Sequence, residues 1–265
     1  MNVFLFEFKA ATRASFGWIL AFAAIVVFFM SFYASFHSDA VQVSQLLSGI
    51  PETVRKALSL DISSLTTMFG FFSYILPYVL LGGAVQALAL GMGMVAKETN
   101  QKTVDFLLAK PISRAPVLTA KLLAGLAWII LTNIAFLIVT LIMAKVVNPD
   151  PFSQKTLLLL SVSLGLVQLF FLAFGGLVAC VKPKIKSVIG VSLSTAFVFF
   201  ILNLFGSIIG DSAIRYVTPF KFYDPRYIVA HSVYEARFML LELAYVVIFL
   251  VVGYAVYSRR DNNQN

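Results

Sequence analysis

Five polar side chains interrupt segments of the sequence that are otherwise strongly apolar. They are Gln86, Asn133, Gln168, Asn203 and Glu242. Polar groups at membrane depth are costly and usually face protein or water, so each of the five is a candidate for lining a translocation path. For the four amides, hydrogen bonding between helices is the favoured alternative. For Glu242 the two interpretations are balanced, because a buried carboxylate needs a partner, a wet cavity or a bound proton.

The sequence offers little for catalysis by the chain itself. It contains no G-x-x-x-x-G-K-[ST] phosphate-binding loop and no H-E-x-x-H zinc motif. Its two histidines, His37 and His231, are far apart in the sequence, and such residues are more often ordinary interfacial groups than metal ligands. The single cysteine, Cys180, allows neither a disulfide nor a cysteine-based metal site. We therefore expect no metal site, no catalytic residue, no bound cofactor and no nucleotide hydrolysis on this chain.

The composition predicts an all-α protein of the membrane. Hydrophobic residues make up 60% of the 265 residues and charged residues only 12%, which no ordinary soluble domain of this length shows. The run 17–36 is too long for the apolar core of a signal peptide, so we treat it as a mature span. With no convincing internal repeat, residues 1–265 are expected to form a single transmembrane domain. A membrane span needs about 20 apolar residues, and six segments meet this requirement: about 17–36, 65–96, 117–145, 157–180, 187–210 and 238–257.

The second apolar segment is longer than a membrane span requires. Either its first part, near Leu65–Phe72, lies outside the bilayer, or Pro77 kinks the helix by removing one backbone hydrogen bond. Within the same segment, Gly83, Ala87 and Gly91 repeat at a spacing of four residues. Small residues with this spacing form a ridge that lets a second helix approach closely. We expect this ridge to hold helices together, inside the bundle or across a dimer.

Basic residues indicate the orientation of the spans. With both termini in the cytoplasm, twelve basic and four acidic residues lie on the cytoplasmic side and give a net charge of +8, whereas eight of each on the outer side cancel. Because lysine and arginine are enriched in cytoplasmic loops, both termini are predicted to be cytoplasmic. The basic residues are dispersed between apolar spans and form no patch with interleaved aromatics, so no binding of nucleic acid is expected.

Two segments outside the spans are predicted to lie at the membrane surface. At the N-terminus, Phe4, Leu5 and Phe8 share one side of a short helix that also carries Glu7 and charged residues after it. This pattern suits a helix in the cytoplasmic interface, and an ordinary flanking segment is an equal alternative. Residues 211–237 contain two prolines and many aromatic residues. We expect a partly re-entrant structure at the outer interface, in which the prolines interrupt any single helix.

The most polar long run between two apolar segments covers residues 97–121. Within it Val104, Leu107 and Leu108 stand at positions i, i+3 and i+4, so they share one face of a short helix. Pro111 forces the residue before it out of the helical conformation and ends that helix. The orientation of the spans places this run in the cytoplasm. The prediction is a short cytoplasmic helix, a break and then a long apolar helix.

This run also carries a family resemblance. The stretch KETNQKTVDFLLAKPISRAPVLTAKLL resembles the signature of the type-2 permeases of ABC transporters, in which a Glu, a later Thr, a Leu pair, Pro-x-Ser-Arg and a following Lys recur. A glycine often precedes that threonine in the family, whereas this sequence has Lys102. The matching positions are Glu98, Thr103, Leu107, Leu108, Pro111, Ser113, Arg114 and Lys121.

The resemblance implies a division of labour between subunits. Two six-span permeases, either two copies of this chain or this chain and a related one, would pair with two cytoplasmic ATPase subunits that bind ATP and magnesium. The short helix at 99–109 would be the coupling helix that docks on the ATPase. The residues implied in ATPase coupling are Glu98, Thr103, Val104, Leu107, Leu108, Pro111 and Arg114.

We therefore expect the permease subunit of an ATP-driven exporter in a bacterial plasma membrane, in contact with membrane lipids. One alternative is a secondary transporter driven by an ion gradient, which would be expected to carry more intramembrane charge or broken helices. Another is an intramembrane enzyme, which needs paired catalytic groups at membrane depth. No pattern of charge along the spans selects a substrate.

Overall fold

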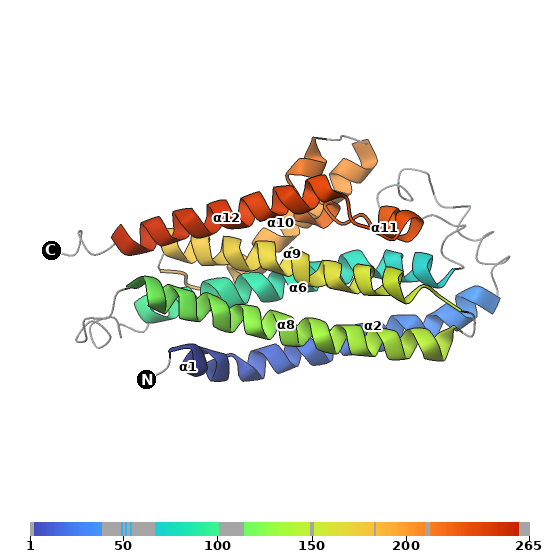
Figure 1. Cartoon of the computed structure of the whole chain (residues 1–265), viewed down its shortest axis with the longest axis horizontal. Helices are drawn as coiled ribbons and strands as arrows, with labels where there is room; N and C mark the ends of the chain where they lie inside the picture. Colours follow the sequence, from blue (N-terminus) through green and yellow to red (C-terminus); the bar gives the residue numbers. More distant parts are fainter. Residues whose placement is uncertain are drawn as a thin grey trace.

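The computed structural model describes residues 3–38, 67–100, 114–148, 151–182, 184–209 and 213–259, together with Gly49, Pro51 and Val54. Among these residues the regular structure is entirely helical. The long helices lie side by side along one axis, and α1 and the end of α12 lie at the same end of the bundle (Figure 1). The elements are α1 (Val3–Ala10), α2 (Thr12–Ser38), α6 (Met68–Asn100), α8 (Arg114–Val147), α9 (Gln154–Val181), α10 (Val188–Ile209), η1 (Ile214–Tyr216), η2 (Pro219–Lys221), α11 (Pro225–His231) and α12 (Ala236–Arg259).

The all-α fold class and the six predicted spans are confirmed. Six of the described helices are long and apolar enough to cross a membrane, and each coincides with one predicted segment to within a few residues. The overlong second segment forms a helix from Met68 that continues past Pro77 to Asn100. Leu65 lies outside the described residues. The candidate spans are Thr12–Tyr33, Met68–Ala96, Ala115–Val147, Gln154–Val181, Val188–Ile209 and Ala236–Arg259.

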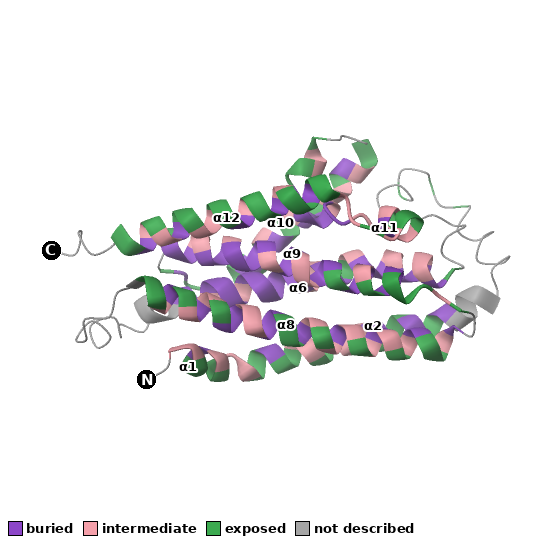
Figure 2. Ribbon diagram, viewed as in Figure 1, coloured by how far each residue is buried: buried purple, intermediate pink, exposed green. Residues whose placement is uncertain are grey.

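Helices α6 and α9 form the core of the bundle. In their most apolar windows 78% and 61% of the residues are buried, compared with 33% or less in the other four spans. Figure 2 shows buried residues along α6 and α9 and many exposed residues along α2 and α12. The outer helices therefore present apolar side chains that only lipid or another protein can cover.

The small-residue ridge of α6 lies against α9. A Cβ atom added at Gly91 would lie 2.5 Å from the carbonyl oxygen of Leu172, and one added at Gly175 would lie 2.9 Å from that of Leu88. At Gly83 an added Cβ would collide with the side chain of Leu164, and Ala87 between the two glycines is fully buried. The two backbones can therefore cross this closely only because glycine stands at the crossing.

The described residues between α10 and α12 form three short helices in place of one long helix, and the predicted interruption by prolines is confirmed. Pro219 stands at the start of η2 and Pro225 at the start of α11, positions where the missing proline N–H is not needed. Asp224 caps α11 by accepting a hydrogen bond from the backbone N–H of Arg226 at 2.9 Å. Ser232 ends α11 in the left-handed conformation, with φ of 50°. This segment packs against α10, α6 and α9.

Candidate functional site

A buried ion pair joins three helices near the end of the bundle that carries the termini. The Lys121 ammonium of α8 donates to Glu7 Oε1 of α1 at 2.7 Å and to the carbonyl oxygen of Met94 in α6 at 2.6 Å. The side chain of Lys121 is fully buried, and that of Glu7 is 6% exposed. A charge removed from water in this way requires close opposite charge and further hydrogen bonds, and this site supplies both.

A second contact fixes α1 to α8 at Phe8, the residue that follows Glu7. The indole N–H of Trp128 donates to the carbonyl oxygen of Phe8 at 2.9 Å, and the two rings stack with centroids 4.6 Å apart. The predicted N-terminal helix is therefore present, but its acidic side chain points into the protein, while Leu5 and Phe6 are exposed. Sequence analysis missed the partner of Glu7 because the pair is separated by 114 residues.

Most residues predicted to couple the chain to an ATPase lie outside the described residues. These are Thr103, Val104, Leu107, Leu108 and Pro111. For Glu98 and Arg114 the structure describes the backbone alone, at the end of α6 and at the first residue of α8. The Lys121 contact with Met94 therefore joins the two helices that flank the predicted coupling segment.

Three of the five intramembrane polar residues meet at one place between α6, α8 and α9. Gln168 donates to the side-chain oxygen of Gln86 at 2.8 Å, and Gln86 donates to the hydroxyl of Thr132 at 3.0 Å. Asn133 donates to Gln168 at 2.6 Å and to the carbonyl oxygen of Ile129 at 2.9 Å. Gln86 and Gln168 are fully buried. The amide side chains thus link three helices, as expected if they serve helix–helix hydrogen bonding.

Asn133 also borders a groove of about 280 Å³ on the outer surface of α8 and α9. The groove is lined mainly by leucine and isoleucine side chains, among them Ile130, Ile134 and Leu169. Gly165 lies opposite Asn133, where an added Cβ would be 3.0 Å from the amide oxygen. The groove is therefore a largely apolar surface between two spans, with Asn133 and Ser161 as its polar lining residues.

Asn203 and Glu242 lie away from this network. Asn203 is partly exposed on α10, where its carbonyl oxygen accepts from Ser207 Oγ at 3.0 Å. Glu242 is 3% exposed on α12 and accepts a hydrogen bond from the hydroxyl of Tyr223 through Oε2. Its other oxygen, Oε1, has no hydrogen-bond partner among the described residues. Burial and the nearby Glu242 raise the pKa of Tyr223, so the phenol stays protonated and can donate.

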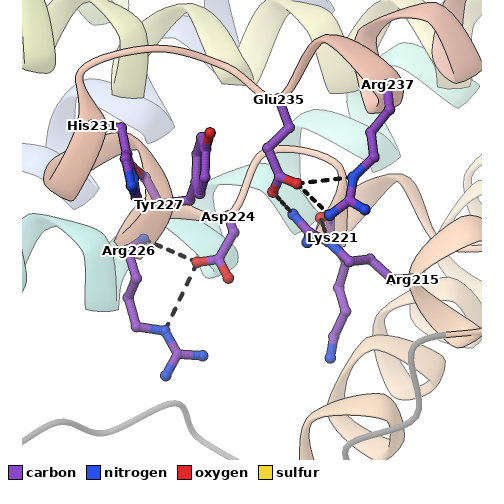
Figure 3. Close-up of polar contacts among 8 residues, drawn as sticks. All are labelled: Arg215, Lys221, Asp224, Arg226, Tyr227, His231, Glu235 and Arg237. Carbon is purple, nitrogen blue, oxygen red and sulfur yellow. Dashed lines mark hydrogen bonds and ion pairs between the residues drawn. The ribbon is translucent and has the colours of Figure 1, made fainter.

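A charged cluster holds the segment that follows α10 onto the start of α12. Figure 3 shows Arg215 and Arg237 pointing toward Glu235, whose carboxylate accepts hydrogen bonds from both guanidinium groups. Burial opposes ionisation of Glu235, but the hydrogen bonds from Arg215 and then Arg237 outweigh it and lower the pKa of the carboxyl. The Nε of Arg215 also donates to the carbonyl oxygen of Lys221 at 3.2 Å. This cluster was not predicted. The predictions for residues 211–237 rest on their prolines and aromatic residues and do not consider pairing among their charged residues.

Comparison with known proteins identifies the family. A family model described as ABC-2 family transporter protein matches residues 1–262. The chain belongs to this family. The resemblance carried by residues 97–123 is thereby confirmed, and the chain is a multi-pass membrane permease of the ABC transporter class. The search of curated proteins gave no match.

Proposed function

We propose that this ABC-2 permease is the membrane subunit of an ATP-driven exporter, and that its 97–114 segment couples it to a separate ATPase. The observation that carries the proposal is the Lys121 contact, which ties α6 and α8 together beside that segment. Force applied there reaches both helices at once. Because α6 packs closely on α9 at Gly91 and Gly175, a displacement of α6 also moves the core of the bundle.

The ATPase partners supply the chemistry that this chain lacks. The sequence has no phosphate-binding loop, so ATP and magnesium would be bound by two ATPase subunits. Two permeases, identical or related, would complete the assembly. An apolar face made of Val104, Leu107 and Leu108 would provide the buried contact with the ATPase, and charged residues at its rim would set the register. The direction of transport, outward from the cell, follows the resemblance to type-2 exporters.

Replacing one residue of this apolar face tests the proposal. Leu107→Glu places a carboxylate in the proposed contact, whereas Lys102→Glu places the same group on the opposite face of the predicted helix. With the permease expressed beside its ATPase, Leu107→Glu should abolish co-purification of the ATPase and leave the amount of permease in the membrane unchanged. Lys102→Glu should retain the ATPase. Retention of the ATPase by Leu107→Glu would refute the docking role of this face.

A further inference from the structure

The described residues between α10 and the start of α12 carry more positive than negative charge. From 213 to 237 the structure describes four arginine or lysine side chains and two carboxylates. The basic residues are Arg215, Lys221, Arg226 and Arg237, and the acidic residues are Asp224 and Glu235. Two positive charges are therefore left without a matching carboxylate in this segment.

The two carboxylates are already engaged. Glu235 is shared by Arg215 and Arg237. Asp224 caps α11 through the backbone N–H of Arg226, and its Oδ1 forms a long, exposed ion pair of 3.8 Å with Nε of the Arg226 side chain. Among the described residues, no carboxylate lies within ion-pair distance of the Lys221 ammonium. Within this segment Lys221 is therefore an ammonium with no paired carboxylate, and the exposed Arg226 has only the long 3.8 Å contact with Asp224.

Lys221 is an ammonium in an unfavourable position. Its side chain is partly buried, and burial lowers its pKa, with Asp224 opposing and Arg226 and Arg215 adding repulsion. The backbone of Lys221 is held by Arg215, which donates to its carbonyl oxygen. In the view of Figure 3 the side chains of Lys221 and Arg226 extend in the same direction, away from Glu235. Asp224 lies between the backbone ends of these two side chains. An anion beside both groups would relieve this repulsion.

The position of the cluster in the fold indicates which anion is available. Arg237 is the second residue of the apolar helix α12, and Lys221 approaches Gly206 near the end of α10. The cluster therefore lies where two spans leave the apolar layer. Tyr216, which is 46% exposed beside Arg215, is of the type that favours the membrane interface. Phosphate groups of lipids occupy this depth.

We propose that Lys221 and Arg226 form a binding site for a phosphate group, carried by an anionic phospholipid of the leaflet opposite the termini. The lysine supplies a compact positive charge, and the exposed guanidinium of Arg226 supplies paired N–H donors for phosphate oxygens. The site is independent of the transport role, because binding requires neither ATP nor a partner ATPase.

The test measures lipid binding to the purified full chain. The wild type in phosphatidylcholine nanodiscs is titrated with phosphatidylglycerol, and bound lipid is counted by native mass spectrometry. Lys221→Gln and Arg226→Gln should each weaken binding about five-fold, and the double variant roughly 30-fold, since a basic residue near the membrane surface contributes on the order of 1 kcal/mol. Lys155→Gln, which removes an exposed lysine at the start of α9, is the matched control and should bind like the wild type.

The control and a competition arm decide the outcome. Unchanged binding by the double variant overturns the proposal, and so does an equal loss in Lys155→Gln, because that result means diffuse surface charge. Displacement of phosphatidylglycerol by millimolar inorganic phosphate in the wild type supports a phosphate site that also accepts soluble phosphate. Failure of phosphate to compete, with binding still dependent on Lys221, supports a site specific for the lipid. Arg226 is exposed, so its variant also serves if Lys221→Gln lowers the yield of folded protein.

Discussion

Lys121 in α8 and Glu7 in α1 form an ion pair of 2.7 Å that is almost completely hidden from solvent. The same ammonium also reaches the Met94 carbonyl of α6, so one side chain connects the N-terminal helix to both helices that flank residues 101–113. In a low-dielectric interior such a group holds helices together mainly because the loss of either partner leaves a buried charge.

Removing one residue of the Lys121–Glu7 pair should therefore lower stability more than removing both. Lys121→Met and Glu7→Leu are each expected to lower stability by about 3–5 kcal/mol, and the double variant by much less than their sum. Thermal unfolding of the purified protein in detergent measures the cycle. Lys145→Met, which removes an exposed lysine of the same helix, should leave the midpoint unchanged. Additive losses from the two single variants would show that the pair is not coupled.

The close crossing of α6 and α9 predicts opposite effects for one substitution at two glycines. Gly91→Ala must separate the helices, because the added Cβ would lie 2.5 Å from a backbone oxygen, and a loss of about 1–3 kcal/mol is expected. Gly17→Ala in α2 meets nothing within 4 Å. It should be neutral or stabilise the helix by up to about 1 kcal/mol. Equal unfolding temperatures for both variants would contradict the close contact.

Local features of this fold could be predicted from the sequence, whereas contacts between distant segments could not. Apolar length predicts the six spans because every span must satisfy its own backbone hydrogen bonds in lipid. Pro219 and Pro225 predict the breaks between α10 and α12 for an equally local reason. The spacing of Gly83 and Gly91 predicts a small-residue face but not its partner, since the rotation of α6 toward α9 depends on the whole bundle. The ion pair between Lys121 and Glu7 could not be predicted, because each residue has the sequence surroundings of an ordinary charged residue at the membrane interface.

The amide network between α6, α8 and α9 allows packing and transport to be separated. Gln168→Leu removes the acceptor of Asn133 and the donor to Gln86, so a loss of about 1–3 kcal/mol is expected from the buried groups left unsatisfied. If the network serves packing alone, Gln168 does not contact the transported substrate. ATP-dependent transport per folded molecule should then stay within about two-fold of the wild type. Transport lost at unchanged folded amount would instead place Gln168 on the translocation path.

The Arg215–Glu235–Arg237 cluster should make the stability of the outer segment depend on acid. The folded-state pKa of Glu235 lies below its ordinary value of 4.5, so its contribution is fully present above that value and is lost as pH falls through the lower folded-state pKa. Limited proteolysis between residues 213 and 237 should therefore accelerate below about pH 4.5 in the wild type.

Two variants identify the group responsible for this acid sensitivity. In Glu235→Gln the segment should be cleaved faster at neutral pH, because two guanidinium groups lose their shared carboxylate, and the cleavage rate should no longer rise on acidification through the same range. Asp224→Asn keeps the side-chain oxygen that caps α11 and should retain the acid-dependent step of the wild type. An acid-dependent step of wild-type size in Glu235→Gln would show that another carboxyl group controls the segment.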